Sequence, residues 1–395
     1  MAGGGGGQGS STSYAGSPSG TNYNSSKKLY GADASSGGGG GSGYYGGNGG
    51  SGGAGGGGGT CYTGGVSNGT TTQGERSGHG FARITYDTTP PNQTSTALTT
   101  IDWTSVNANA AGTRSWTAAT DVGTGLDVSG VKGYNVRWNG STTYQTGTSY
   151  TPAALSAAGI YNLEIQTVDN AGNTSAYKTI LTYKYDPNAP GQSSTGLTTV
   201  DWTNVNADAA GARTWTAATD IGTVGTNASG IKGYNVRWNG ATTLQTGTSY
   251  TPTALTAAGI YNLEIQTVDN AGNTSAYKTI LTYKYDPDAP NQTGTALTTV
   301  EWTSANVSAM NTQTWAAAAD AGTAGTNASG VRGYNVRWNG TTTFQTGTLF
   351  TPTALTAAGI YNLEIQTVDN AGNTSAFKTI LIYKFDNDIP GKKAM

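Results

Sequence analysis

The chain has 395 residues, which gives room for three or four domains of ordinary size. Charged residues make up only 11% of it, against about 25% in a typical soluble domain, and the formal net charge is −2. Lys and Arg nowhere cluster, so the chain lacks the basic field that binds nucleic acid. A surface of Ser, Thr, Asn and Gly is typical of β-proteins outside the cell, and we expect an extracellular or cell-surface location.

The residues that most enzymes depend on are scarce. Cys61 is the single cysteine and His79 the single histidine, so an internal disulfide is excluded and a structural zinc site lacks ligands. Both lie in glycine-rich sequence, where a Cys–His nucleophile has no orienting partner. No glycine run leads into the Gly-Lys-Ser/Thr of a phosphate-binding loop. We therefore expect no enzyme activity and no organic cofactor.

Both ends of the sequence look cut. No apolar run approaches the roughly 20 residues of a transmembrane helix, and no secretory signal pattern opens the chain. The first residues lead straight into a glycine run at 3–7, as if inside a module. Residues 387–395 continue a motif that opens each earlier unit, so we interpret them as the start of a truncated next unit or a tail. Other parts of the same protein are therefore expected partners.

Residues 1–86 form a glycine-rich region with 32 of the 62 glycines. One interpretation is a flexible linker. The other rests on glycine runs at 37–41 and 55–59, on Tyr44-Tyr45-Gly46-Gly47, and on a β-like ending over 78–86. These features resemble the glycine-rich domain of anaplastic-lymphoma-kinase-type receptors and of bacterial surface proteins. That resemblance implies glycine runs packed as polyproline-II-like helices, in a domain truncated at its start.

Three units of about 100 residues follow, at 87–186, 187–286 and 287–386. Trp116 corresponds to Trp215 and Trp315, and residues 146–186 differ from 246–286 at only two positions. Such near-identity is typical of a duplicated spacer or multivalent binder and unusual for an enzyme.

Each unit reads as short strands separated by turns. In the first unit, alternation places Tyr134, Val136 and Trp138 on one face, and Asn139-Gly140 then favours a hairpin turn. A second alternating strand covers 161–166, a turn follows at 169–173, and a last strand covers 178–185. Seven or so strands in 100 residues predict an all-β fold of three tandem β-sandwiches.

Several segments of each unit resemble a fibronectin type III domain or a bacterial Ig-like repeat. Residues 115–121 resemble strand B, residues 129–136 strand C, and Val168-Asp169-Asn170-Ala171-Gly172-Asn173 the F–G turn. Leu155, six residues before Tyr161, fits that family's tyrosine corner. The stretch from 103 to 111 is longer than usual. The resemblance covers 87–386 and implies three non-enzymatic Ig-like modules.

That topology implies a candidate calcium site at one end of each unit. It would bring together three aspartates, whose carboxylates are ligands that calcium accepts. The alternative is that these residues form turns, which Asp-Pro and Asp-Asn sequences suit. The three sets are Asp87, Asp121 and Asp169; Asp186, Asp220 and Asp269; and Asp286, Asp320 and Asp369.

A second candidate site consists of Trp103, Trp202 and Trp302, which precede the predicted strand B. They are the tryptophans that we expect to be most exposed, and exposed tryptophan can stack on sugars or protein partners. Packing inside the fold is the simpler interpretation.

Three functions remain open on the sequence. The first is a stalk or adhesin segment that spaces or presents a module binding a surface glycan or protein. The alternative is an accessory, non-catalytic region of a secreted carbohydrate-active enzyme. A phage tail-fibre segment is the third.

Overall fold

The computed structural model describes residues 23–24, 46–47, 86–123 and 128–387. Within the glycine-rich region it gives strand β1 (Tyr23–Asn24), paired antiparallel with strand β2 (Gly46–Gly47). The predicted glycine helices, Cys61, His79 and the ending at 78–86 otherwise lie outside the described residues, as does the tail after 387.

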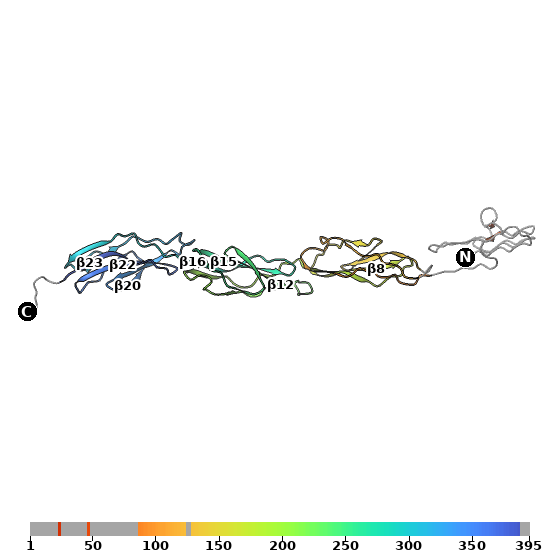
Figure 1. Cartoon of the computed structure of the whole chain (residues 1–395), viewed down its shortest axis with the longest axis horizontal. Helices are drawn as coiled ribbons and strands as arrows, with labels where there is room; N and C mark the ends of the chain where they lie inside the picture. Colours follow the sequence, from red (N-terminus) through yellow and green to blue (C-terminus); the bar gives the residue numbers. More distant parts are fainter. Residues whose placement is uncertain (1–22, 25–45, 48–85, 124–127, 388–395) are drawn as a thin grey trace, which may run out of the picture. The chain divides into compact units, whose positions relative to one another are not determined.

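Seven strands occupy corresponding places in each predicted repeat, which Figure 1 draws in successive colours from orange to blue. Repeat 1 contains β3 (Thr99–Thr104), β4 (Arg114–Ser115), β5 (Val131–Trp138), β6 (Ser141–Gln145), β7 (Ser149–Tyr150), β8 (Gly159–Asp169) and β9 (Lys178–Tyr185). Repeat 2 contains β10 (Thr198–Thr203), β11 (Arg213–Thr214), β12 (Ile231–Trp238), β13 (Ala241–Gln245), β14 (Ser249–Tyr250), β15 (Gly259–Asp269) and β16 (Lys278–Tyr285). Repeat 3 contains β17 (Thr298–Thr303), the 3₁₀ turn η2 (Val307–Ala309), β18 (Gln313–Thr314), β19 (Val331–Trp338), β20 (Thr341–Gln345), β21 (Leu349–Phe350), β22 (Gly359–Asp369) and β23 (Lys378–Phe385).

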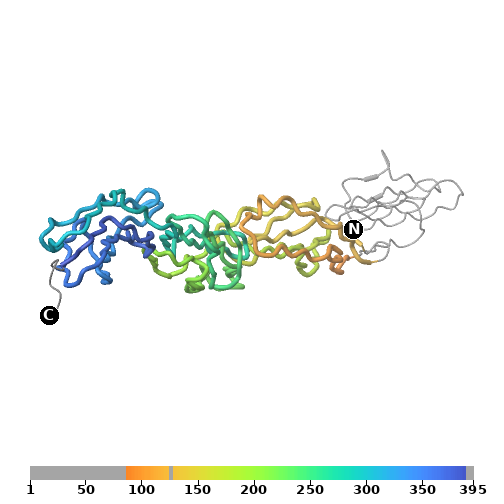
Figure 2. The backbone as a smooth tube through the Cα atoms, turned by 60° about the vertical axis from the view of Figure 1, so that its left-hand side comes forward, coloured from red at the N-terminus to blue at the C-terminus, as the bar shows by residue number. Residues whose placement is uncertain are grey.

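Each repeat folds into a five-stranded sheet and a two-stranded sheet. In repeat 2 the strand order is β10-β16-β15-β12-β13 in the large sheet and β11-β14 in the small one. Only β10 and β16 pair parallel, and the other neighbours are antiparallel. The backbone of each repeat accordingly runs back and forth along its strands (Figure 2). The prediction of an all-β fold with three sandwich repeats is confirmed.

The alternating residues of the two central strands form the core. Tyr134, Val136 and Trp138 are all at most 3% exposed, and Leu163 on β8 is fully buried. Trp116 from the small-sheet side meets Tyr134 edge-on, with ring centroids 5.5 Å apart. Because side chains alternate along a strand, every second residue points inward and fills the space between the two sheets.

Two predicted local features hold the strands in register. Asn139 and Gly140 both have positive φ, as the two-residue turn between β5 and β6 requires. The hydroxyl of Tyr161 donates a 2.9 Å hydrogen bond to the carbonyl of Ala157, which is the predicted tyrosine corner. The hairpin and the corner are both confirmed.

An asparagine that the sequence did not single out clamps the long segment before strand β11. In repeat 2 the Asn206 amide donates to the Leu255 carbonyl and accepts from the Leu255 N–H, both at 2.8 Å. The hydroxyl of Tyr285 lies 3.1 Å from the same amide nitrogen. Asn107 and Asn306 make the same pair of backbone bonds in the other repeats. The clamp explains how this segment is held against the fold.

We predict that Asn206→Ala lowers the free energy of unfolding of repeat 2 by about 2–4 kcal/mol, because both backbone groups of Leu255 lose their partner. Differential scanning calorimetry of the full chain measures the effect as a transition moved to lower temperature. Asn235→Ala is the matched control, since that amide lies in a half-exposed pair with Gln266 and its loss should cost less than about 1 kcal/mol. Equal losses in the two variants would contradict the clamp.

Candidate functional site

Three aspartates from separate segments meet at one end of each repeat. In repeat 2, Asp186 directly precedes the repeat, Asp220 lies in the loop before β12, and Asp269 ends β15. One carboxylate oxygen from each lies within 4.8 Å of the other two. Asp186 and Asp269 are fully buried. The structure thus brings together the residues that the sequence proposed as calcium ligands.

Backbone and amide donors hold these carboxylates in place. Asn273 donates its N–H to one oxygen of Asp269 at 2.7 Å and its side-chain amide to the other at 2.8 Å. Asp186 accepts from the N–H of Ser229 at 2.8 Å, and Asp220 from the N–H of Gly230 at 2.7 Å. The aspartates therefore also shape turns, and the two interpretations of the sequence are compatible.

Like charge accumulates at this cluster. None of the ion pairs in the described part of the chain involves its aspartates. Burial raises the pKa of Asp269 despite its bonds to Asn273, and the charges of Asp220 and Asp186 raise it further. Two carboxylates 4.8 Å apart repel by on the order of 3 kcal/mol at an effective dielectric constant of about 20. A divalent cation would turn that repulsion into attraction.

The other two repeats repeat the arrangement. Burial is also the main cause of the raised pKa of Asp369. At the partly exposed Asp87, by contrast, hydrogen bonds from Ser129 are the main cause and the pKa is lowered. In repeats 1 and 3, too, one carboxylate oxygen from each aspartate lies within 4.8 Å of the other two. The two sets are Asp87, Asp121 and Asp169, and Asp286, Asp320 and Asp369.

Carboxylate oxygens suit calcium, which takes six to eight oxygen ligands and accepts carbonyls and water to complete the set. The three aspartates of each cluster offer one oxygen each to such an ion. Each carboxylate oxygen that already accepts one N–H keeps a lone pair for a cation. Calcium binding here stays a prediction.

We expect calcium to raise the melting temperature of the chain relative to the same protein in chelator. A ligand at one hundred times its dissociation constant stabilises by about 2.7 kcal/mol, which shifts the melting temperature of a 100-residue domain by roughly 10 °C or more. Calorimetry in chelator, calcium and magnesium makes the measurement.

The matched control is Asp220→Asn, which keeps an oxygen acceptor for Gly230 and removes one negative charge. This variant should melt in chelator at or above the wild-type temperature, and repeat 2 should lose its response to calcium. A wild-type melting temperature that is the same in calcium and in chelator would leave the aspartates as turn residues.

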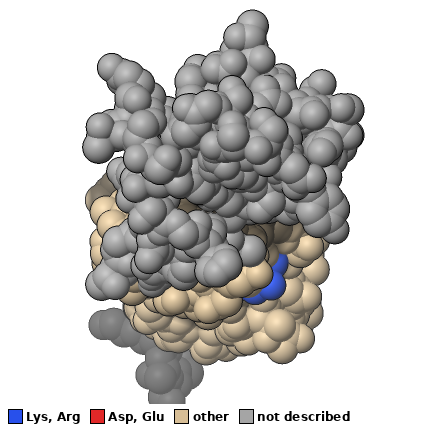
Figure 3. Space-filling view, turned by 90° about the vertical axis from the view of Figure 1, so that its right-hand side faces the viewer, with Lys and Arg blue, Asp and Glu red and all other residues tan. Residues whose placement is uncertain are grey.

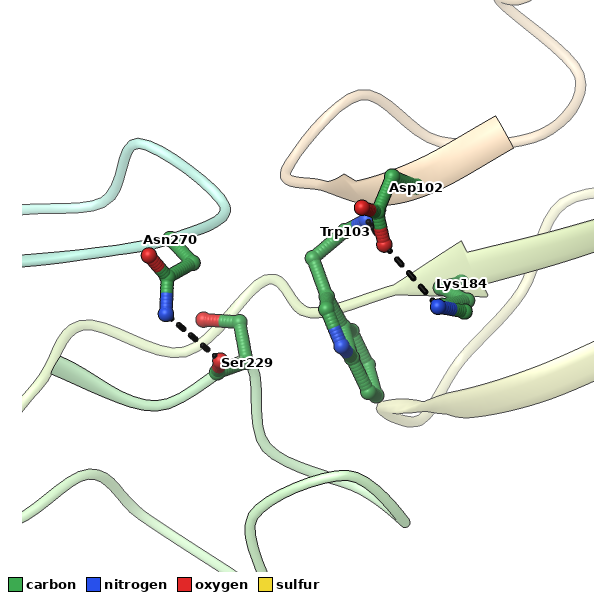
Figure 4. A network of polar contacts seen from close by, with 5 residues as sticks. All are labelled: Asp102, Trp103, Lys184, Ser229 and Asn270. Atoms are coloured by element: carbon green, nitrogen blue, oxygen red, sulfur yellow. Dashed lines mark hydrogen bonds and ion pairs between the residues drawn. The ribbon is translucent and has the colours of Figure 1, made fainter. Parts of the chain in front are cut away.

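The three predicted ligand tryptophans are not equally exposed. Trp302 is 57% exposed, whereas Trp103 and Trp202 are partly buried. Figure 4 shows Trp103 beside the ion pair of Asp102 and Lys184, whose atoms lie 3.0 Å apart. Of these three tryptophans, Trp302 alone is as exposed as the sequence predicted.

The sequence analysis missed one group of exposed residues on the outer face of the large sheet. Tyr144, Leu244 and Phe344 hold the same position in the three repeats, each about half exposed. Counted outward from the Asn139-Gly140 turn, the hairpin register pairs Tyr144 with Asn135. Asn135 lies between the buried Tyr134 and Val136, so its side chain and that of Tyr144 are on the outer face of the sheet. The hairpin register could therefore have identified them.

On the one face drawn in Figure 3, the described atoms in view belong almost all to uncharged residues, with one patch of Lys or Arg. None of the helices in the described residues is long and apolar enough to cross a membrane.

The fold defines a class of protein: tandem β-sandwich repeats, each with a five-stranded and a two-stranded sheet. No family model matches the chain. It is 33% identical to exoglucanase B of Cellulomonas fimi over 316 residues, which are 76% of this chain and 27% of the relative. It is 31% identical to endoglucanase B of Cellulomonas fimi over 66% of this chain and 25% of the relative. It is 38% identical to chitinase A1 of Niallia circulans over 41% of this chain and 22% of the relative.

These relatives are much longer than the matched region, and the chain spans about a quarter of their length. Among solved structures, the fibronectin(III)-like modules of CbhA from Clostridium thermocellum align with 49% of this chain and 91% of their own. Their identity is 13% and the TM-score 0.25, and no argument rests on this likeness.

Proposed function

We propose that residues 87–386 are a non-catalytic accessory region of a secreted polysaccharide-degrading enzyme. One observation carries the proposal: the chain matches two glucanases at 31% and 33% identity over 66% and 76% of its length, and the match occupies only about a quarter of each relative. Repeated β-sandwiches that match about a quarter of a longer enzyme are suited to be a module beside its catalytic domain. The catalytic domain would lie in another part of the same protein.

Three equivalent glutamates on the outer face of the large sheets support a non-catalytic role. Glycoside hydrolysis needs two carboxyl groups that face a common cleft. Glu164 on the outer sheet face is instead bound to Arg137 at 2.6 Å, and the Arg137 guanidinium lies 4.0 Å from the ring centre of Tyr177. The equivalent glutamates, Glu264 and Glu364, pair in the same way with Arg237 and Arg337. A carboxylate held in this way is a structural group.

The repeats are suited to work as spacers. Each has its own buried core, and Asp-Pro-x-x-Pro segments at 186–190 and 286–290 join them. Proline fixes φ and so stiffens such a segment. A surface of uncharged polar residues fits work outside the cell, where the polymeric substrates of such enzymes lie.

The stalk or adhesin function uses the same spacing property and is the competing proposal. The near-identity of residues 146–186 and 246–286 favours it, because surface stalks change length by duplication. The similarity to two glucanases and a chitinase supports the accessory region better than the stalk. No observation favours a phage tail fibre.

An antibody against residues 87–386 distinguishes the two. Applied to the source organism, it should detect a protein in the culture fluid whose gel band clears embedded β-glucan or chitin in a zymogram. The isolated repeats, run beside it, should clear neither polymer. A band held in the cell fraction that clears no polymer would overturn the accessory function in favour of the stalk.

A further inference from the structure

The outer face of the large sheet carries one exposed ring in repeats 1 and 3. Phe344 on β20 pairs with Asn335 on β19, which pairs with Gln366 on β22. The three side chains form a row across the sheet, and the Asn335 amide donates to Gln366 at 2.9 Å. Neighbouring strands lie about 4.8 Å apart, so the row is about 10 Å long, the length of roughly two sugar rings.

A glycine beneath the ring lets it lie against the sheet. A Cβ at Gly333 would come within 2.8 Å of the Phe344 ring, and one at Gly133 within 2.6 Å of the Tyr144 hydroxyl. One side of each ring therefore covers backbone, while 47% and 48% of the two side chains stay exposed. The Tyr144 hydroxyl donates to the Lys132 carbonyl at 2.9 Å, which fixes its ring. These are preorganised flat apolar surfaces.

Polar groups that suit a neutral, hydroxyl-rich ligand surround each ring. The Arg332 guanidinium lies 5.2 Å from the centre of the Phe344 ring, and Lys132 is exposed beside Tyr144. Thr342 lies two residues before Phe344 on the same face and is exposed. Hydroxyl and ammonium groups can bond the hydroxyls of a sugar whose apolar side rests on the ring.

Repeat 2 supplies a natural comparison. Leu244 replaces the ring, and a groove of about 510 Å³ lies there, lined by Lys232, Gln245, Thr246, Gly247 and Ser249 with Leu244. The backbone around it is the same hairpin, with Asn235 paired to Leu244. The protein therefore folds with either side chain at this position.

We propose that Tyr144 and Phe344 are stacking platforms for a neutral polysaccharide, and that repeat 2 lacks one. The choice of polymer, a β-glucan or chitin, rests on the proposed function. The row of ring and two amides matches a sugar chain in size and in its mixture of apolar and hydrogen-bonding groups.

A protein partner fits this face less well. A stable protein interface buries about 800 Å² on each side around an apolar centre. At this position the face offers one exposed ring in repeat 1, one in repeat 3 and a leucine in repeat 2, each beside amides and hydroxyls. The low charge also leaves little for electrostatic recognition of a charged partner.

Sedimentation of the purified chain with microcrystalline cellulose and with colloidal chitin tests the proposal. The wild type should bind at least one polymer. Tyr144→Leu with Phe344→Leu, which installs the repeat 2 residue, should lower the bound fraction at fixed polymer by about fivefold or more. Leu244→Tyr should raise it, because a third platform adds avidity.

Two controls complete the experiment. Tyr144→Phe keeps the ring and should bind like the wild type, and Trp302→Ala leaves both platforms intact and should do the same. Unchanged melting temperatures show that the variants fold.

Failure of the wild type to bind either polymer would overturn the platforms, as would full binding by the double leucine variant. Loss of binding in Trp302→Ala with retention in the double leucine variant would move the site to the tryptophan. These binding results neither support nor contradict the proposed accessory function, which the zymogram tests separately.

Discussion

A buried carboxylate organises one end of every repeat. Asp269 ends the longest strand of its sheet with its side chain fully buried, where an unpaired charge would cost several kcal/mol. Asn273 satisfies both of its oxygens and also donates to the backbone carbonyl of Asp186. One asparagine therefore ties the turn after β15 to Asp186, the residue that directly precedes the repeat. The turn and the candidate ion site are a single polar network.

This network constrains what the site can do. Asp186 and Asp220 are held by the N–H groups of Ser229 and Gly230, so the three carboxylates cannot move apart to relieve their repulsion. Protonation and cation binding are the two ways left to reduce the charge. Because Asp269 is fully buried, its protonation state and any bound ion act directly on the stability of the repeat.

The features that the sequence predicted well rest on short-range rules. Alternation identified Tyr134 and Trp138 as core, and Asn139-Gly140 fixed the hairpin through its positive φ angles. The resemblance to known repeats supplied the rest of the topology, including the meeting of Asp186 with Asp269. Without that topology, residues 83 positions apart could not have been placed together.

Long-range side-chain contacts were harder to predict. Asn107 reads as a loop residue, and only the fold shows that it bonds both backbone groups of Leu155. Trp302 and Trp103 have matching neighbours in sequence yet differ in exposure, which depends on tertiary surroundings. The outward position of Tyr144 could have been predicted from the hairpin register. Its contact with Gly133 could not, because it depends on the conformation of the side chain.

The separate cores have a genetic consequence. Each core cluster draws its residues from one repeat, so the gene segment for a repeat encodes a complete folding unit. Recombination between the nearly identical segments for 146–186 and 246–286 would add or delete a whole unit without disturbing any core. The length of the array can therefore change between strains in steps of one repeat, while every surviving unit keeps its aspartates and its hairpin.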